Sequence, residues 1–541
     1  MSTIEMTGEA IIQMRGDAKS LSQAGLSHAD ESGFFAQNPM TGERLEPRFC
    51  SASKADVEMA AKLACEAAPA MAAASGRTRA DLLFLMTEKL MAAQEQIVQR
   101  AHLETGLPLA RLNGEMGRTV GQLRLFAELV AEGSWVDARI DTALPERTPA
   151  PRPSLRSMLR PLGPVVVFGA SNFPLAFSVA GGDTAAALAA GCPVIVKAHP
   201  AHPGTSELVA RAICDAATEL GWHPGTFALL FDSGVAVGTA LVQHPGIKAV
   251  AFTGSAAGGK ALMKLAAARP EPIPCFAEMG SSNPVFVMPG AMQARATAIA
   301  SSLATSFTMG SGQFCTKPGV VFVPKETPQS FWQELKKIVG GMTSLGMLTE
   351  GIAERFREGV GERRRTVGAI EKIVEASAET QSATAAGLPI VMKSSIKEFL
   401  AMPELEEEIF GPAMLVIEYD DAKQLVAAAR QLRGHLTATI HAEEAENTAP
   451  LLALLETRAG RLVWNGYPTG VEVSPAMVHG GPFPATTDSR FTSVGTASIF
   501  RFARPVCFQD VPDVLLLEEL QATNPLGIER LVNGRRTREI L

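Results

Sequence analysis

Short apolar runs alternate with alanine-rich segments through the middle of this chain, and this alternation is the feature that most constrains its fold. The apolar runs are rich in β-branched residues and have the length of buried strands, whereas the segments between them have the composition of helices. The expected strands are 165–168, 194–197, 227–231 and 249–252, and the expected helices are 184–190 and 206–220. Strands that alternate with helices in this way predict a doubly wound, parallel α/β sheet.

A second series of the same kind follows Glu278. Its strands are expected near 285–288 and 320–323, and a helix is expected near 292–309. With 541 residues, the chain is also too long for one ordinary hydrophobic core. The predicted fold class is therefore α/β, with two doubly wound parallel lobes.

The segments that flank these two series have different patterns. Residues 54–132 repeat apolar side chains at intervals of three and four, which predicts amphipathic helices that cover a sheet. Residues 144–164 contain six prolines, a composition that suits an extended connector or edge strands. Toward the C-terminus, 493–501 and 505–517 are expected to form a closing strand and a tail.

The composition argues against several classes of function. The formal net charge of −7 leaves no general basic surface, so nucleic acid is not an expected partner. The seven cysteines are scattered without ligand-like spacing, so neither a bound metal nor a disulfide framework is expected. The most apolar stretch, 165–196, is interrupted by polar residues and glycines, which argues against a membrane span. Because the N-terminus does not resemble a secretory signal, the expected location is the cytoplasm.

Cys315 is the first candidate for chemistry. It lies in the segment 312–316, Gly-Gln-Phe-Cys-Thr, just after the expected helix 292–309. A glycine-flanked loop can hold a thiol at a cleft with backbone N–H groups nearby, which would lower the thiol pKa and let the thiolate attack a carbonyl carbon. The alternative is a buried small apolar residue, which is the commoner role of an unpaired cysteine.

Three other segments place polar groups at the ends of expected strands. Glu278, followed by glycine, is placed where a general base would sit with a pKa raised by partial burial; a solvated strand end is the alternative. The Asn172 amide could donate to a developing oxyanion, the alternative being a turn residue before proline. Gly254 and Ser255 begin an expected helix whose free N–H groups would suit a pyrophosphate, the alternative being a plain helix cap.

Taken together, these four segments and three others resemble the ordered motifs of the aldehyde dehydrogenase superfamily. The motifs are SNFP at 171–174, VIVKAHP at 194–200, FTGS at 252–255, FAEMG at 276–280, GQFC at 312–315, EEIFGP at 407–412 and HGGPFPAT at 479–486. The resemblance covers residues 35–510, which is nearly the whole chain.

The resemblance implies roles for the catalytic residues. Cys315 would be the nucleophile that forms a thioester, and Glu278 would be the base that activates water for its hydrolysis. The oxyanion hole would consist of the Asn172 amide and the Cys315 backbone N–H. His479 could polarise Cys315 or assist Glu278, the alternative being a structural histidine in a turn.

The resemblance also implies NADP or NAD as cofactor. Lys197 would meet the adenosine ribose, Gly254 and Ser255 the pyrophosphate, and Glu408 and Phe410 the nicotinamide ribose and ring. NADP is slightly favoured, because Pro200 stands where a carboxylate commonly bonds the adenosine 2′-hydroxyl and repels a 2′-phosphate.

By the same resemblance, residues 1–279 form a cofactor-binding domain with 144–164 as bridging strands. Residues 280–485 would form the catalytic domain, and 486–541 a closing or oligomerisation strand and a tail. The bridging strands would make a homodimer or a homotetramer.

Pro200, His479 and the tail at 504–510 depart from the commonest members of the superfamily, and these departures resemble one of its subgroups. It contains the 2-oxoglutarate semialdehyde (2,5-dioxopentanoate) dehydrogenases and an NADP-dependent fatty aldehyde dehydrogenase. The implied reaction is oxidation of 2-oxoglutarate semialdehyde to 2-oxoglutarate, with a long-chain aliphatic aldehyde as the alternative substrate. A substrate with a distal carboxylate needs a cation, for which Lys317 and Arg490 are the candidates.

Two other functions are compatible with the same fold. A CoA-acylating dehydrogenase would pass the acyl group to CoA, but Glu278 argues against it because no water then needs a base. A catalytically silent binding protein is a possibility from another class. It has no physical need to retain Cys315, Glu278, Asn172, Lys197 and Glu408 together.

Overall fold

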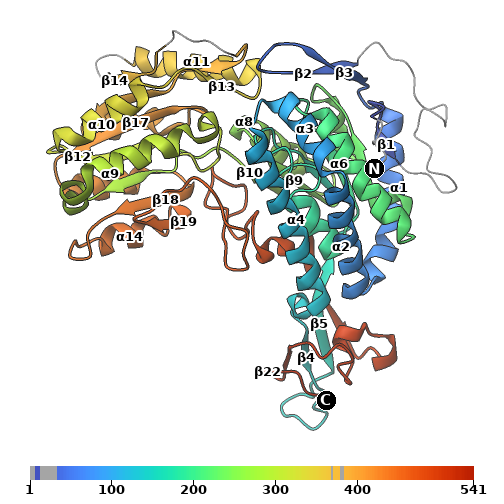
Figure 1. Ribbon diagram of the computed structural model, residues 1–541. Helices are drawn as coiled ribbons and strands as arrows, with labels where there is room; N and C mark the ends of the chain where they lie inside the picture. The colour runs from blue at the N-terminus through green and yellow to red at the C-terminus, as the bar shows by residue number, and fades with distance from the viewer. Residues whose placement is uncertain (1–5, 13–32, 367–369, 378–382) are drawn as a thin grey trace.

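The computed structural model describes residues 6–12, 33–366, 370–377 and 383–541. Figure 1 shows two α/β lobes side by side and a small sheet that projects away from the first lobe. Long helices cover the first lobe, shown in blue and green, while the second lobe, yellow to orange, lies beside it. The predicted two-lobed α/β architecture is therefore confirmed.

The first lobe is built on a six-stranded sheet within the described residues, in the order β1-β8-β7-β6-β9-β10. All neighbouring strands are parallel except β1, which pairs antiparallel with β8. Four of these strands lie within one residue of the ranges predicted from the apolar runs. The strands are β1 (Ile11–Ile12), β6 (Val165–Phe168), β7 (Val194–Lys197), β8 (Phe227–Leu230), β9 (Ala249–Thr253) and β10 (Cys275–Glu278).

Helices cover both faces of this sheet, because successive side chains of a strand point to opposite sides. Val165 and Val167 belong to the core under α2 to α6, whereas Val166 packs with residues of α1 and α7. The amphipathic helices predicted for 54–132 are four in number, and α2 and α3 meet at Ala93. The helices are α1 (Lys54–Ala73), α2 (Gly76–Ala92), α3 (Gln94–Thr105), α4 (Leu109–Glu132), α5 (Gly182–Ala190), α6 (Pro203–Glu219), α7 (Ala236–Gln243) and α8 (Ala256–Ala267).

The second lobe contains a seven-stranded sheet in the described part of the chain, in the order β14-β16-β17-β12-β11-β18-β19. Only β14 runs antiparallel to its neighbour. Its strands are β11 (Val285–Val287), β12 (Val320–Pro324), β14 (Glu371–Glu375), β16 (Ile390–Ser395), β17 (Ala413–Tyr419), β18 (His435–His441) and β19 (Ala459–Trp464).

The helices of the second lobe also lie on both faces. Val321 and Val323 pack under α9 and α10, whereas Val320 and Phe322 pack with the helices of the other face. These helices are α9 (Pro289–Thr308), α10 (Gln329–Gly340), α11 (Glu350–Arg365), α12 (Ile396–Ala401), α13 (Ala422–Gln431) and α14 (Ala449–Leu455).

The projecting sheet joins the proline-rich segment to the C-terminal end of the chain (Figure 1). In the described residues its strand order is β20-β5-β4-β21-β22. Its members are β4 (Arg139–Asp141), β5 (Leu155–Pro161), β20 (Ala503–Gln509), β21 (Arg530–Val532) and β22 (Arg535–Thr537). The domain boundaries implied by the resemblance stay a prediction.

One sequence prediction in this region is wrong. The closing strand expected at 493–501 is instead a turn followed by the 3-10 helix Thr496–Phe502, and the strand begins at Ala503. The buried side chains of the helix, Ser498, Ile499, Arg501 and Phe502, recur at about three residues and not at two. Tertiary burial therefore selects a helical turn here.

Two small two-stranded sheets complete the fold among the described residues. One pairs β2 (Phe34–Gln37) with β3 (Arg44–Phe49), and the other pairs β13 (Leu345–Gly346) with β15 (Ala386–Gly387). Among the helices of the described residues, none is both long and apolar enough to cross a membrane.

Candidate active site

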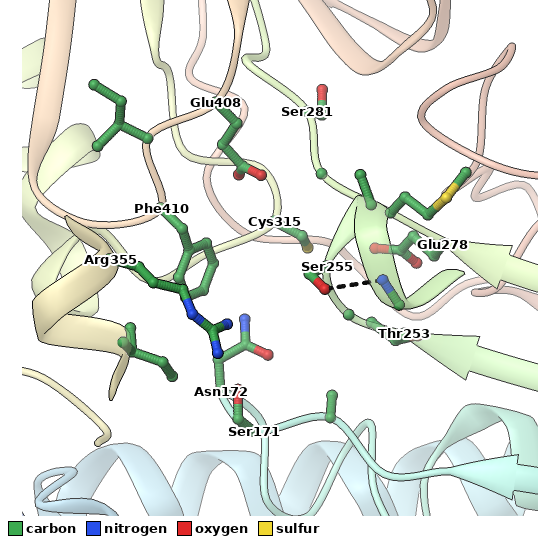
Figure 2. A pocket seen from close by; sticks show the side chains of 18 of the residues that line it. Ser171, Asn172, Thr253, Ser255, Glu278, Ser281, Cys315, Arg355, Glu408 and Phe410 are labelled. Carbon is green, nitrogen blue, oxygen red and sulfur yellow. Dashed lines mark hydrogen bonds between the residues drawn. The ribbon is translucent and has the colours of Figure 1, made fainter. Parts of the chain in front are cut away.

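A cavity of ≈ 930 Å³ opens at the carboxyl ends of the first-lobe strands and is closed by residues of the second lobe. Figure 2 shows side chains from both lobes converging on it. Six of the residues proposed from the sequence line this cavity, while Gly254 lines it as backbone. The six are Asn172, Ser255, Glu278, Cys315, Glu408 and Phe410.

Cys315 is carried on a tight loop after α9, whose shape depends on left-handed backbone conformations. Gly310, Ser311 and Gly312 have φ values of 56°, 60° and 66°. A Cβ on Gly312 would lie 2.3 Å from the Gly411 carbonyl oxygen, so glycine is required there. The loop therefore packs closely against the backbone at Gly411, and Cys315 faces the cavity (Figure 2).

Asn283 fixes the other side of the Cys315 loop. Its fully buried side-chain amide donates to the carbonyl oxygens of Cys315 and Lys317 at 2.8 and 3.0 Å. Its carbonyl oxygen accepts from the Thr437 hydroxyl at 2.9 Å. This side chain thus connects the loop to β18, in which Thr437 lies.

Three reactive groups meet beside this loop. The Cys315 Sγ lies 3.5 Å from His479 Nε2, and the same nitrogen lies 2.9 Å from Glu278 Oε1. His479 and Glu278 are 0% and 3% exposed through their side chains. Ser493 donates its hydroxyl to the second Glu278 oxygen at 2.6 Å. The structure therefore brings Cys315, Glu278 and His479 into one cluster.

The geometry of His479 favours one tautomer. Its Nδ1 is buried without a hydrogen-bond partner among the described residues, whereas Nε2 faces both the Glu278 carboxylate and the thiol. A proton on Nε2 can be donated to the carboxylate, whereas a proton on Nδ1 would be buried without an acceptor. A proton on Nε2 therefore fits the site best.

The pKa values of the cluster differ from the sequence prediction. Burial raises the pKa of the Cys315 thiol well above its ordinary value, and the charges of Glu278 and Glu408 raise it further. Burial would also raise the pKa of Glu278, but the charge of His479 and hydrogen bonds from His479 and Ser493 outweigh it and lower the pKa. The expected low thiol pKa and high carboxyl pKa are both wrong, because burial dominates at the thiol and the contacts of His479 and Ser493 dominate at the carboxyl.

The consequence is a thiol that rests beside an ionised carboxylate. The thiol proton must leave before Cys315 can act as a nucleophile. The ligand-type atoms of Cys315, Glu278 and His479 lie within 4.8 Å of one another, a spacing that a metal ion also tolerates. The absence of a metal stays a prediction.

Asn172 is held by two backbone contacts at the edge of the cavity. Its amide nitrogen donates to the Gln313 carbonyl at 2.9 Å, and its own carbonyl accepts from Arg111 at 2.7 Å. An amide nitrogen carries two protons, so one remains to donate toward the cavity. Asn172 and Cys315 both line the cavity (Figure 2), where an oxyanion hole would need their donors to converge on one oxygen.

Most, but not all, of the residues proposed to bind the cofactor line the cavity. Ser255 caps α8 and accepts from the Gly258 N–H at 3.2 Å, so the helix N-terminus points at the cavity beside Gly254. Phe410 offers its ring to the same space (Figure 2). Lys197, in contrast, does not line the cavity, and its ammonium donates to the Asp232 carbonyl at 2.7 Å. Burial lowers the Lys197 pKa to about 8.

Glu408 is the most unusual of these residues. Burial raises the pKa of its carboxyl to about 7, although the charge of Lys317 and the Ser281 backbone N–H oppose this change. A Cβ on Gly280 would lie 2.2 Å from Glu408 Oε2, so this carboxyl sits against bare backbone. Close to neutral pH it can carry or lose a proton, which suits a polar contact with a ribose.

Both sequence candidates for binding a distal substrate carboxylate are wrong. Lys317 is 1% exposed and donates to the carbonyl oxygens of Ile409 and Ala413 at 3.1 and 2.8 Å. Arg490 has an exposed side chain that is paired with Asp488 at 2.6 Å. A buried lysine needs acceptors and finds them in backbone carbonyls, so Lys317 supports the loop.

The sequence reasoning missed Ser493, Asn283 and Arg111 as supporting residues. Each acts across more than 30 residues of chain, on Glu278, Cys315 and Asn172 respectively. Asn283 carried a detectable signal, because it lies in the motif region just after Glu278. Ser493 and Arg111 have no local pattern that singles them out.

Comparison with known proteins identifies the family of this arrangement. The sequence profile of the aldehyde dehydrogenase family matches residues 27–482. The chain belongs to the aldehyde dehydrogenase family. It is therefore an oxidoreductase that acts on aldehydes.

Two curated members of the aldehyde dehydrogenase family are similar over almost their full length. Alpha-ketoglutaric semialdehyde dehydrogenase 2 of Azospirillum brasilense is 49% identical over 98% of this chain and 100% of its own. Alpha-ketoglutaric semialdehyde dehydrogenase of Acinetobacter baylyi is 48% identical over 90% of this chain and 92% of its own.

Solved structures of aldehyde dehydrogenases share the fold at lower identity. The aldehyde dehydrogenase KauB from Pseudomonas aeruginosa has a TM-score of 0.77 and 21% identity, over 94% of this chain and 97% of its own. Aldehyde dehydrogenase C from Pseudomonas syringae, in complex with NAD+ and octanal, has a TM-score of 0.75 and 22% identity, over 90% and 95%.

Proposed function

We propose that this aldehyde dehydrogenase oxidises 2-oxoglutarate semialdehyde to 2-oxoglutarate with NAD(P). The observation that carries the chemistry is the meeting of Cys315, His479 and Glu278 at one end of a large two-lobed cavity. The substrate is proposed from the two relatives named above, at 49% and 48% identity over nearly full length.

The cavity fits a dinucleotide in volume and chemistry. Its ≈ 930 Å³ lies within the usual range for sites that enclose cofactors. The N-terminus of α8 at Ser255 would hold the pyrophosphate, and Phe410 with Glu408 would meet the nicotinamide ring and its ribose. The chemistry that a bound NAD(P) supplies there is acceptance of a hydride from the aldehyde carbon.

The residues of the chain would carry out the remaining steps. Cys315 loses its proton to solvent through the cavity that it lines, and its thiolate adds to the aldehyde carbon to give a thiohemiacetal. The Asn172 amide and the Cys315 backbone N–H stabilise the oxygen anion. Loss of the hydride leaves a thioester on Cys315. Glu278 then takes a proton from water, whose oxygen attacks the thioester and releases the acid and the thiol.

We also propose a slight preference for NADP over NAD. Pro200 lines the cavity and offers neither a carboxylate to bond a 2′-hydroxyl nor a charge to repel a 2′-phosphate. Both cofactors should therefore support turnover, with NADP having the lower KM.

Reduced-cofactor formation with a panel of aldehydes and each dinucleotide tests this proposal. The panel contains 2-oxoglutarate semialdehyde, succinate semialdehyde, pentanal and a long aliphatic aldehyde. We expect the highest kcat/KM with 2-oxoglutarate semialdehyde, without added CoA, and none with Cys315→Ala, which should still bind the dinucleotide. A higher kcat/KM for the long aldehyde would favour a long-chain aldehyde dehydrogenase instead. A requirement for CoA would favour a CoA-acylating dehydrogenase.

We further propose a homodimer or homotetramer assembled through the projecting sheet. Strand β20 lies at an edge of that sheet, and nearby Val514 and Leu515 are 86% and 74% exposed. Unpaired strand edges and exposed apolar side chains favour association. Light scattering coupled to gel filtration gives the mass directly, and a monomeric mass would exclude this assembly.

A further inference from the structure

Arg118 of α4 is an arginine that the mechanism described above does not use. Its guanidinium carbon lies 5.2 Å from the Phe177 ring centre and 6.0 Å from that of Phe173. The Phe177 ring is in turn 6.2 Å from the imidazole of His479, which contacts the thiol of Cys315. Arg118 therefore lies one aromatic layer away from the reactive cluster.

The polar atoms of Arg118 have unused bonding capacity. Its Nε and Nη2 atoms are buried and have no hydrogen-bond partner within the described part of the chain. One oxygen of the neighbouring Glu115 carboxylate accepts from the backbone N–H groups of Leu175 and Ala176 at 2.9 and 3.0 Å, and the other has no hydrogen-bond partner among the described residues. A guanidinium keeps its charge in proteins, and a buried charge without a partner is costly. An anionic ligand would remove that cost.

A second cation faces the same region. Arg461 of β19 donates to the carbonyl oxygens of Pro468 and Gly470, while its buried Nε has no partner among the described residues. The charges of Arg118 and Arg461 both interact with Cys315. Neither arginine lines the ≈ 930 Å³ cavity, so a dinucleotide there would leave them free for the aldehyde.

We propose that Arg118, supported by the charge of Arg461, binds the carboxylate end of the substrate while the aldehyde carbon meets Cys315. This inference rests on the proposed function, and it names the residue that selects an ω-oxo acid over a neutral aldehyde. The aldehyde and carboxylate carbons of a five-carbon semialdehyde are four C–C bonds apart, roughly 5 Å when extended. Arg118 and Cys315 are close enough for their charges to interact directly, so a ligand held on Arg118 would have its other end near the thiol. The planar guanidinium matches a carboxylate in a bidentate pair.

A rival role for Arg118 is purely electrostatic. Its positive charge lowers the pKa of the Cys315 thiol against the effect of burial and the carboxylates. In that role Arg118 would assist every aldehyde equally, whereas a carboxylate contact assists only acidic substrates. The two roles are therefore separable by comparing a charged and a neutral substrate of equal length.

The test compares 2-oxoglutarate semialdehyde with pentanal in the wild type, Arg118→Gln and Arg118→Lys. In Arg118→Gln we expect kcat/KM for the semialdehyde to fall about 10- to 100-fold, mainly through KM, as for the loss of a charge-assisted hydrogen bond. For pentanal we expect kcat/KM to stay within about threefold. Arg118→Lys should recover part of the loss, because lysine keeps the positive charge but cannot form the bidentate pair with a carboxylate.

Arg124→Gln is the matched control, because Arg124 is an exposed arginine on the same helix. It should leave both substrates unchanged. Dinucleotide binding and the thermal midpoint establish that each variant is folded, and Arg118→Lys carries the test if Arg118→Gln does not fold.

A second measurement does not depend on turnover. The product 2-oxoglutarate should slow alkylation of Cys315 by iodoacetamide in the wild type and in Arg124→Gln, but not in Arg118→Gln. Equal protection in all three proteins would overturn the proposed contact.

The outcomes separate this inference from the proposed function. If the wild type does not prefer the semialdehyde to pentanal, the proposed substrate is wrong. If the wild type does prefer it but Arg118→Gln lowers both substrates equally, Arg118 acts through Cys315 and the carboxylate contact is wrong.

Discussion

A single imidazole nitrogen faces both reactive groups of this enzyme. His479 Nε2 lies 3.5 Å from the thiol and 2.9 Å from the Glu278 carboxylate, while Nδ1 has no partner among the described residues. A relay through both ring nitrogens would need a partner at each, so this histidine cannot pass a proton from one ring nitrogen to the other here. It instead contacts the sulfur and the carboxylate through the same nitrogen, so it positions both groups.

Replacing Glu278 by glutamine is expected to separate acylation from hydrolysis. Addition and hydride transfer need the thiolate, whereas thioester hydrolysis needs a base for water. Reduced cofactor should form in a burst of about one equivalent per site, followed by a steady state at least about 100-fold below the wild type. Rapid mixing, with mass spectrometry of the quenched protein, detects the acyl group on Cys315. With no burst and no adduct, Glu278 would act before acylation, and His479 would become the candidate base.

The raised pKa of the Cys315 thiol predicts a distinctive alkylation profile. Only the thiolate reacts, so the rate with iodoacetamide in the free enzyme should keep rising beyond pH 9. Glu278 raises this pKa, so Glu278→Gln should lower it and increase the alkylation rate at pH 8. A tenfold increase in the thiol acidity constant should make the reaction about tenfold faster. The peptide containing Cys315 must be followed by mass spectrometry, because Cys65 and Cys507 are exposed. A rate that is unchanged or lower in the variant would contradict the assigned cause.

At the scale of elements, the turn from β7 to α6 brings Pro200 to the cavity. The strand ends at Lys197, and the helix begins at Pro203, so residues 198–202 form the rim. His202 is fully buried and places its Nε2 2.8 Å from the Ala170 carbonyl, which holds this rim against the segment that carries Asn172. A side chain at position 200 is therefore placed by a rigid turn.

Pro200→Glu is expected to weaken NADP far more than NAD. The new carboxylate would repel a 2′-phosphate and could accept from a 2′-hydroxyl. We expect kcat/KM for NADP to fall about 10- to 100-fold, and that for NAD to change by less than about threefold. Pro200→Gln is the control, because it removes the proline without adding charge. An equal loss for both cofactors in Pro200→Glu would show that position 200 does not face the ribose.

At the scale of the whole molecule, the C-terminal segment returns to pack against the first lobe. Arg501, in the 3-10 helix Thr496–Phe502, pairs with Asp183 of α5 at 2.7 Å, and their side chains are 4% and 11% exposed. The neighbouring Ser493 bonds Glu278, so the same return of the chain also positions the base. The same segment therefore contributes both to the stability of the first lobe and to the position of the base.

Arg501→Met is expected to destabilise the protein, because it leaves Asp183 buried without its partner. Breaking a buried pair on one side costs about 3 to 5 kcal/mol, so the thermal midpoint followed by circular dichroism should fall by several degrees. The double variant Asp183→Leu with Arg501→Met should regain much of the loss. Arg490→Met, which removes an exposed pair, should leave the midpoint unchanged. An unchanged midpoint in Arg501→Met would mean that this pair contributes nothing.

The sequence by itself determined the periodic elements and the reacting residues. β-branched runs such as 165–168 and 194–197 became strands with those bounds, because they are buried on both faces and their apolar pattern is local. Cys315, Glu278 and Asn172 were found because each follows a recognisable segment of regular structure. The 3-10 helix at Thr496–Phe502 was missed, because its burial comes from the distant first lobe.

Only the tertiary structure decided the chemical state and partners of those residues. The thiol and carboxyl pKa values are opposite to the expected directions, because burial raises the thiol pKa, while His479 and Ser493, about 200 residues from Glu278, lower the pKa of its carboxyl. Lys317 was a candidate for the substrate until two buried carbonyl groups were seen to bind it. A pKa and a hydrogen bond depend on distance in space and on burial, and neither is encoded by spacing along the chain.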